Sequence, residues 1–242
     1  MNFPHYAKYL NFARKTRGRV KYLGRLVVYL AIFFAVFSVS CVVALRFIPV
    51  TLTPLKVLRV AESPHGSLFP CSKWRSLGRI DPVMVRAVIA SEDSRFTDHN
   101  GFDWPAIRQA FRNNQRGGKL HGASTISQQT AKNVFCSYRR TWLRKGLESY
   151  YTVLIETLWG KRRIMEVYLN IIETHTDVYG VEAAARRFYG KSASQLNAYE
   201  ASMIAAVLPS PRRMDLSRPS GYMTGRAAAI RYNMNDLPRI DL

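Results

Sequence analysis

The chain has 242 residues, enough for one domain of ordinary size beside a membrane anchor. Hydrophobic residues make up 48% of it, which excludes a chain that is disordered throughout and provides a core without metals or disulfides. The 36 lysines and arginines outnumber 16 acidic residues, and the net charge of +20 favours anionic partners such as phospholipid headgroups, diphosphates or nucleic acid.

The first predicted element is a transmembrane helix over residues 26–45. These 20 residues carry no charge, and their length matches the hydrocarbon core of a bilayer. Seven basic residues precede the helix, so the positive-inside rule puts the basic segment 1–25 in the cytoplasm and the rest of the chain outside. A cleaved signal peptide is the alternative, with Ser38-Val39-Ser40 as its cleavage site, although the apolar run continues past this triplet.

Residues 46–78 are predicted to form a membrane-proximal connector, and residues 79–242 to form one further domain. The connector contains four prolines, and its apolar residues lack a sustained helical period. The cysteines Cys41, Cys71 and Cys136 do not have the spacing of a zinc site. Free thiols are the ordinary interpretation, and a Cys71–Cys136 disulfide is compatible with an oxidising compartment.

Helix-start signals are dense from residue 80 onward. Asp81 followed by Pro82 predicts a helix that runs to about Glu92. Asp103 caps a second predicted helix over residues 104–114. Its inward face is expected to carry Trp104, Ile107, Ala110 and Phe111. The sequence Thr125-Ile126-Ser127-Gln128 has the form of a capping box and predicts a third helix.

The second half of the domain adds four predicted helices. A long helix is expected over residues 141–159, and three more fit residues 161–171, 181–188 and 195–207. The buried face of the long helix is expected to carry Leu147, Tyr151, Leu154 and Leu158. Strand alternation is scarce, so the predicted fold is mainly α, with a small irregular or β-containing lobe.

Glu92 is the first candidate for catalysis because its helix is predicted to end there. The negative end of the helix dipole raises the proton affinity of a carboxylate, which suits a general base near neutral pH. Asp93 lies beside it in the sequence, and Arg95 is close enough to orient it. The alternative is a solvated acidic helix end without a catalytic role.

The segment GASTISQQTAKN, residues 122–133, is the second candidate site. Small residues lead into a hydroxyl-rich helix start, whose free N–H groups bind phosphate well. Gln128 and Gln129 share the helical face of Lys132. Amides can hold sugar hydroxyls while the ammonium group neutralises a phosphate. The alternative is an ordinary capped helix with a polar face.

A polar stripe on the long predicted helix is the third candidate. Its members are spaced by four residues: Arg144, Glu148, Thr152 and Glu156. An intrahelical Arg144–Glu148 salt bridge is the ordinary interpretation. Four neighbouring cations favour a site for an anion, because their mutual repulsion is costly unless they are solvated or face one. These cations are Arg139, Arg140, Arg144 and Lys145.

Taken in order, these segments resemble the family 51 glycosyltransferases, which polymerise bacterial peptidoglycan. The match covers roughly 130 residues, from about Val83 past Pro211. Its five motifs are ASEDSRFTDHNGFDW (90–104), GASTISQQTAKN (122–133), RKGLE (144–148), KRRIMEVYLN (161–170) and GVEAAARRFYG (180–190). Five ordered motifs are far more specific than any one alone. The GAST form and the short, anchored chain look most like the monofunctional biosynthetic members of this family.

The resemblance implies a mainly α, lysozyme-like fold with a head lobe and a membrane-facing jaw lobe, behind one N-terminal transmembrane helix. It implies that lipid II is joined into β-1,4-linked strands, with inversion at the donor anomeric carbon and undecaprenyl diphosphate as the leaving group. No Ser-x-x-Lys occurs anywhere in the chain, so transpeptidase activity is not expected. The implied location is a bacterial plasma (inner) membrane, with the catalytic domain on the periplasmic side.

The resemblance also implies partners. These are lipid II, the lipid-linked growing glycan and membrane lipids, with cell-division or cell-wall synthesis proteins left open and no nucleic acid. No cofactor is required, and dependence on a divalent cation, Mg²⁺ or Mn²⁺, is left open.

The motif positions assign roles to particular residues. Glu92 matches the catalytic base that activates the 4-hydroxyl of the acceptor, and Glu148 matches the second essential glutamate. Lys132 and Arg140 match the basic residues that hold the donor diphosphate. Donor-site or supporting positions are matched by Asp93, Ser124, Gln128, Gln129 and Arg144. Two stretches depart from the family pattern: residues 171–179 lack the expected Gly and Trp, and residues 226–242 match only loosely.

Two rival functions fit parts of the sequence. A lytic transglycosylase or muramidase also uses one glutamate on a lysozyme-like fold, but it cleaves glycan and has no diphosphate to hold with Lys132 and Arg140. A basic anchored module that binds anionic lipid or nucleic acid would explain the charge, but not the ordered Glu, Gln and Lys motifs.

Overall fold

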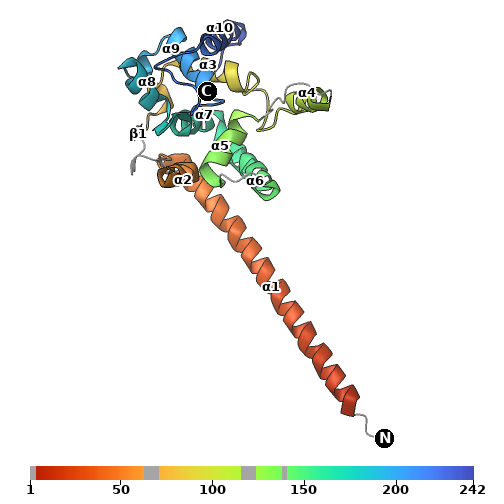
Figure 1. Ribbon diagram of the computed structural model, residues 1–242. Helices are drawn as coiled ribbons and strands as arrows, with labels where there is room; N and C mark the ends of the chain where they lie inside the picture. Colours follow the sequence, from red (N-terminus) through yellow and green to blue (C-terminus); the bar gives the residue numbers. More distant parts are fainter. Residues whose placement is uncertain (1–3, 63–70, 116–123, 138–140) are drawn as a thin grey trace. The chain divides into compact units, whose positions relative to one another are not determined.

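A computed structural model describes residues 4–62, 71–115, 124–137 and 141–242 of the chain. Its contacts divide the chain into two units, Met1–Ala44 and Leu45–Leu242. The first unit consists of most of a long helix, α1 (Pro4–Phe47) (Figure 1). Its stretch Lys21–Phe47 is long and apolar enough to cross a membrane, and no other helix in the described ranges meets that condition. This stretch contains the predicted span.

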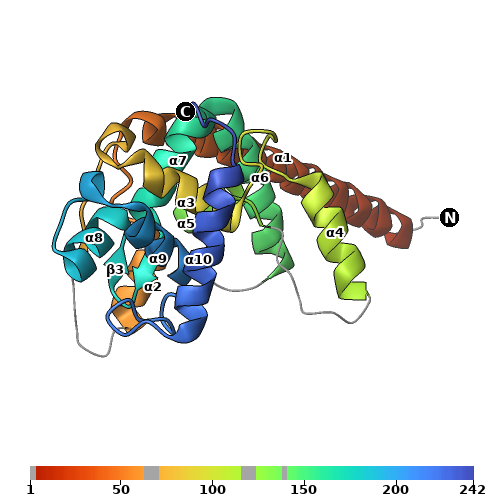
Figure 2. The ribbon, with the colours of Figure 1, turned by 90° about the horizontal axis from the view of Figure 1, so that it is seen from above.

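The second unit is mainly α, as the sequence predicts. Three helices pack together in one group, α3 (Pro82–Glu92), α9 (Ala198–Val207) and α10 (Gly221–Asp236). A second group consists of α5 (Ile126–Phe135), α6 (Trp142–Leu158) and α7 (Gly160–Ile171). The groups meet where Gln129 of α5 donates a hydrogen bond to Glu92, the last residue of α3; Figure 2 shows both helices near the centre of the unit. The site described below lies where α3 meets α5.

The helix starts follow the predicted caps. The Asp81 carboxylate accepts a hydrogen bond from the Val83 N–H and opens α3. Thr125 and Gln128 make both bonds of a capping box at the start of α5, and the Thr141 side chain caps α6. The helix predicted from residue 195 begins only at Ala198, after a short 3₁₀ turn, η2 (Ala193–Gln195). The helix α10 was not predicted from the sequence.

A three-stranded sheet forms the small β-containing part of the unit. Its strands are β1 (Cys71–Ser72), β2 (Glu173–His175) and β3 (Val178–Tyr179), in the order β1-β3-β2. β1 is parallel to β3, and β2 is antiparallel to it. Thus most of the stretch that departs from the family pattern forms a hairpin, which leads into α8 (Val181–Tyr189).

The predicted connector carries two short helices that its sequence pattern did not indicate, α2 (Pro54–Glu62) and η1 (Leu77–Arg79). α2 packs against α5 and buries Lys56. The Lys56 ammonium group donates to the Thr51 carbonyl at 3.0 Å and lies 5.4 Å from the centre of the Tyr179 ring. Burial lowers the pKa of this lysine to about 8. At least this part of the connector therefore belongs to the packed unit.

The helix α4 (Trp104–Gln115) forms as predicted, but the expected burial of its apolar face is wrong. Trp104 and Phe111 are 60% and 64% exposed, and none of its residues is buried. Figures 1 and 2 show α4 extending away from the other helices of the second unit. A helical period identifies residues that share a face, but it does not show whether another element covers that face.

The long helix α6 is also turned differently from the prediction. The four side chains expected in the core are only half-buried: Leu147, Tyr151, Leu154 and Leu158. The fully buried residues are Glu148, Thr152 and Ile155, so α6 turns two members of its polar stripe inward. A carboxylate can be buried in this way only with charged or hydrogen-bonding partners, and the cations of α6 provide them.

Candidate active site

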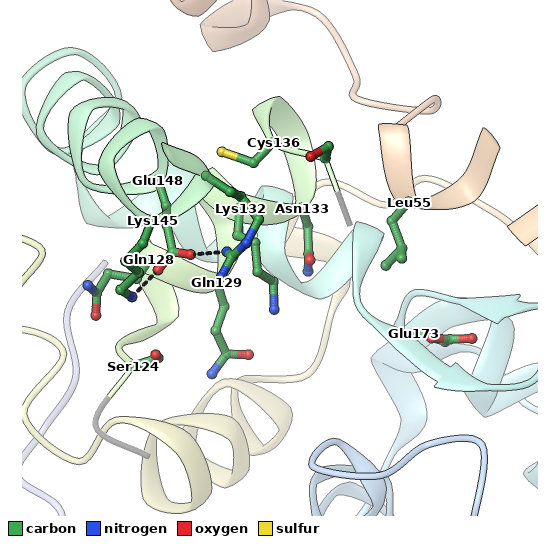
Figure 3. Close-up of a pocket in the computed structure, with 12 residues that line it drawn as sticks. Leu55, Ser124, Gln128, Gln129, Lys132, Asn133, Cys136, Lys145, Glu148 and Glu173 are labelled. Atoms are coloured by element: carbon green, nitrogen blue, oxygen red, sulfur yellow. Dashed lines mark hydrogen bonds and ion pairs between the residues drawn. The ribbon is translucent and has the colours of Figure 1, made fainter. Parts of the chain in front are cut away.

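Two adjoining cavities lie beside α5. The larger has a volume of about 350 Å³, and polar side chains of α5 and α6 line it together with Leu55 of α2 and Glu173 of β2. The smaller has a volume of about 210 Å³ and is lined by the end of α3 and the residues that follow it. Ser124 lines both cavities, so it marks their border. Figure 3 shows Lys132, Gln129 and Glu148 grouped apart from Leu55 and Glu173 in the larger cavity.

Glu92 is the last residue of α3 and lines the smaller cavity. Its side chain is 13% exposed. Oε2 accepts a hydrogen bond from Gln129 Nε2 at 3.0 Å, and Oε1 lies 3.7 Å from the guanidinium of Arg226. Burial raises the pKa of the Glu92 carboxyl, and the Gln129 bond and the charges of Arg226 and Lys132 limit the rise. A carboxylate with a raised pKa is suited to accept a proton near neutral pH.

The orientation of Gln129 is fixed from the core. The hydroxyl group of Tyr168, a fully buried residue of α7, donates to Gln129 Oε1 at 3.3 Å. The amide nitrogen of Gln129 must therefore point at Glu92. The hydrogen bond from Gln129 therefore holds one carboxylate oxygen of Glu92 in place.

Asp93 connects the end of α3 to the start of α5. Its Oδ2 accepts from the Ile126 N–H at 3.0 Å, and its Oδ1 lies 2.9 Å from His99 Nε2. The Gly101 N–H donates to His99 Nδ1 at 3.1 Å, so the proton of the neutral imidazole lies on Nε2 and is donated to Asp93. Thr125 completes the connection by donating to the Gly101 carbonyl at 2.7 Å. These bonds fix the end of α3, which carries Glu92, relative to the start of α5.

Glu148 has a different environment from Glu92. It is 3% exposed, and Arg144 donates to its Oε2 at 2.6 Å while Lys145 forms an ion pair with its Oε1. Both carboxylate oxygens are thus engaged by cations. Because two positive charges meet one negative charge, this cluster remains net cationic at the wall of the larger cavity. Lys132 of α5 adds a further positive charge to the same wall.

Cys136 also lines the larger cavity and is a free cysteine. Burial and the charge of Glu148 raise the pKa of its thiol to about 11. It therefore stays protonated and contributes no charge to the cavity at neutral pH.

Eight of the nine residues that the motifs singled out line one of the two cavities. On the side of the smaller cavity are Glu92 and Asp93, with Ser124 at the border. On the side of the larger cavity are Gln128, Gln129, Lys132, Arg144 and Glu148. Gln128 is mostly buried, and its side chain accepts from the Thr125 N–H at 3.1 Å, so it shapes the helix start. Arg140 lies outside the described residues.

Sequence reasoning missed Arg226 because α10 lies far from every motif in the sequence. The signal that could have located α10 is its period, since its buried residues are Met223, Ala227, Ile230 and Met234. This pattern predicts a helix but not its contact with α3. Lys145 was noted as part of a cation cluster, and its pairing with Glu148 was not anticipated.

The arrangement can take a proton on one side and stabilise a leaving anion on the other. A mostly buried carboxylate lies beside a cationic cavity. This geometry suits transfer of a group from a phosphate-linked donor to a hydroxyl. Within the described ranges, no three His, Cys, Asp or Glu side chains are grouped so that they could hold a metal ion.

Comparison with known proteins gives a consistent match. The family model described as Transglycosylase matches residues 70–235. A biosynthetic peptidoglycan transglycosylase of Bdellovibrio bacteriovorus is 50% identical over 216 residues, which cover 88% of this chain and 86% of the relative. A protein of the same description from Shewanella oneidensis is 46% identical over 221 residues, 91% of this chain and 93% of the relative. One from Rhodospirillum centenum is 49% identical over 200 residues, 83% and 85% of the two chains.

Proposed function

The chain belongs to the transglycosylase family and is a peptidoglycan glycosyltransferase, and on this premise we propose that Glu92 is the general base of glycan polymerisation. The reaction joins lipid II units into a glycan strand. The fold of this family is lysozyme-like, which agrees with the fold expected from the motifs. The roles proposed for individual residues rest on the geometry of the two cavities.

The position of Glu92 is the observation that carries the proposal. It lines the smaller cavity, its Oε2 is bonded to Gln129 of the larger cavity, and its Oε1 accepts no hydrogen bond among the described residues. An acceptor sugar in the smaller cavity would place its 4-hydroxyl within reach of Oε1. Removal of the hydroxyl proton makes the oxygen a nucleophile toward a donor in the larger cavity.

The cationic wall of the larger cavity is assigned to the donor diphosphate. Lys132, Arg144 and Lys145 supply positive charge there, and we include Arg140 by its motif position alone. The diphosphate gains negative charge as its bond to the sugar breaks, so fixed cations stabilise the transition state more than the ground state. Glu148 has the supporting role of holding Arg144 and Lys145 in place.

A single displacement follows from this arrangement. The acceptor oxygen attacks the anomeric carbon as the diphosphate leaves from the opposite face, so an α-linked donor gives a β-1,4 linkage. One base and a stabilised leaving group suffice, and the paired carboxylates of a glycosidase are not needed. Dependence on Mg²⁺ or Mn²⁺ stays open.

We place residues 26–45 across the bacterial plasma membrane, with the basic segment 1–25 in the cytoplasm and residues 79–242 outside as the glycosyltransferase domain. The apolar stretch Lys21–Phe47 supports the anchor, and the charge difference across it supports the orientation. Residues 46–78 connect the two. The substrates and the growing strand carry lipid tails, so membrane lipids surround the reaction. Cell-division or cell-wall synthesis proteins stay open as further partners.

Incubation of the purified full chain with fluorescent lipid II, followed by sizing of the products, tests the proposal. We expect long glycan strands that a muramidase digests, and no release of fragments when preformed peptidoglycan is the only substrate. Cleavage of preformed glycan without polymer formation would favour a lytic enzyme. The absence of both activities, with retained binding to anionic vesicles, would favour a basic binding module.

A further inference from the structure

An arginine outside all of the sequence motifs faces the proposed base. Arg226 of α10 places its guanidinium 3.7 Å from Glu92 Oε1, while Gln129 of α5 bonds Oε2. We propose that Arg226 is a positioning residue for the base: it holds Oε1 at the wall of the smaller cavity and supplies the positive charge that keeps this mostly buried carboxylate ionised. This inference rests on the proposed function, in which Glu92 takes the proton.

The packing of α10 against α3 fixes the position of Arg226. α10 lies beside α3, and Figures 1 and 2 agree on this. Near the middle of α3, Arg86 donates to the carbonyl groups of Met234 and Leu237 at the end of α10. At the end of α3, Glu92 faces Arg226 in the first half of α10. The two helices are therefore antiparallel and joined at two places, which fixes where the guanidinium lies.

Among the described residues, Arg226 forms no ion pair or side-chain hydrogen bond other than its contact with Glu92. Its side chain is 27% exposed, and its Nε is buried without a hydrogen-bond partner in the described part of the chain. Arg231 on the same helix is different, because it donates to Ser202 Oγ at 2.9 Å and lies 5.2 Å from the centre of the Tyr199 ring. A buried donor without a partner is costly, and the attraction between Arg226 and Glu92 offsets this cost.

The distance of 3.7 Å between the Arg226 guanidinium and Glu92 Oε1 allows this oxygen to act as a base. It is too long for a hydrogen bond, so Oε1 keeps a free lone pair, yet it is short enough for strong attraction between the charges. In the reaction the acceptor O–H bond breaks, its proton moves to Oε1, the oxygen bonds to the anomeric carbon and the carbon–diphosphate bond breaks. Glu92 is then neutral beside Arg226, and the cation favours loss of the proton to solvent before the next turnover.

The charged groups that act on Glu92 come from α5, α10 and the residue that follows α3. Lys132 of α5 and Arg226 of α10 favour the ionised carboxylate, and the adjacent Asp93 opposes it. Tyr168 of α7 stays protonated because burial raises its pKa, so it adds no charge. The charge of Arg226 lowers the pKa of Glu92 more than the charge of Lys132 does. Loss of Arg226 should therefore reduce activity most at low pH, where Glu92 becomes protonated.

Three variants of the full chain in detergent test the assignment through the pH profile of lipid II turnover. Arg226→Gln should move the acid limb to higher pH, with a loss of roughly tenfold at the acid end that shrinks as pH rises, because an opposite charge at this distance changes a carboxyl pKa by about one unit or more. Arg226→Lys should restore most of the profile, since the contact is a point charge and not a bidentate pair. Arg231→Gln is the matched control and should lower the melting temperature without moving the limb.

An unshifted acid limb in Arg226→Gln, or an equal shift in Arg231→Gln, would overturn the assignment. A raised KM with an unshifted limb would also overturn it and would indicate a substrate contact. Glu92→Gln is measured in the same series. Full activity in that variant would refute the base itself, whereas inactive Glu92→Gln with an unshifted Arg226→Gln refutes only the role of Arg226.

Discussion

The two glutamates of the site show how environment assigns a role to a residue. Glu148 is bonded on both oxygens by Arg144 and Lys145, so it has no oxygen left to take a proton. Glu92 accepts one hydrogen bond and keeps an oxygen toward the smaller cavity. A carboxylate that is buried and ion-paired organises cations, and a carboxylate that is buried and half-engaged can act as a base.

Glu148→Gln should lower both stability and donor binding. The amide cannot hold two cations, so Arg144 and Lys145 lose their shared acceptor and become mobile at the cavity wall. Loss of a buried ion pair costs about 3–5 kcal/mol. We therefore expect a lower melting temperature together with a raised KM for lipid II. An unchanged melting temperature would contradict the organising role.

Glu182 provides a prediction about pH. Burial alone would raise the pKa of its carboxyl, but hydrogen bonds from Arg75, the Ala193 N–H, Arg186 and Ser192 outweigh burial and lower the pKa to about 2. Because the folded pKa lies below the ordinary value of 4.5, the stabilisation is complete above pH 4.5 and is lost as pH falls toward 2.

Glu182→Gln should reduce the free energy of unfolding by about 2–4 kcal/mol at pH 7 and by much less near pH 2. Urea unfolding at several pH values in detergent measures the difference. Asp241→Asn is the control, because its ion pair with Arg239 is exposed on both sides and should contribute nothing measurable. A pH-independent cost of Glu182→Gln would contradict the pKa argument.

At the scale of the elements, local chemistry was readable from the sequence and tertiary burial was not. The caps at Asp81 and Thr125 are bonds between near neighbours, and the helix starts they predict are confirmed. The buried faces of α4 and α6 depend on what packs against them, and both were predicted wrongly. The motifs identify eight residues that line the two cavities. They do not identify Arg226, because α10 contains no motif.

Two glycine substitutions test the packing of the elements in opposite directions. Gly180 precedes α8 with φ +82°, and a Cβ there would lie 2.7 Å from the Asn170 carbonyl oxygen. Gly180→Ala should cost about 1–3 kcal/mol or more. Gly225 lies inside α10 with open space around it, so Gly225→Ala should stabilise by about 0.5–1 kcal/mol. Melting temperatures that move in the same direction would contradict this account.

At the scale of the whole molecule, the two units have separable contributions. Residues 1–44 form the first unit and contain most of the apolar stretch, whereas the second unit begins at Leu45 and includes α2. α2 packs against α5, which carries Gln129 and Lys132. Loss of the first unit should affect access to membrane-bound substrate, and loss of α2 should affect the site itself.

A variant lacking residues 1–44 should polymerise lipid II in vesicles at least tenfold more slowly, roughly the effect of losing a tether. With detergent-dispersed substrate it should approach the full chain. A variant lacking residues 1–76 should be slow in both assays and melt at a lower temperature. Equal rates of the full chain and the first variant on vesicles would contradict the tethering argument.

The most direct test of the account is the turnover of Glu92→Gln on lipid II, measured with its melting temperature and substrate affinity. Glutamine keeps the shape of the side chain and cannot take a proton. Polymerisation should fall by about 10²–10⁴-fold, the usual effect of losing a general base, while melting and binding stay close to those of the unchanged chain. Retention of more than about a tenth of the rate, well above that range, would show that Glu92 is not the base.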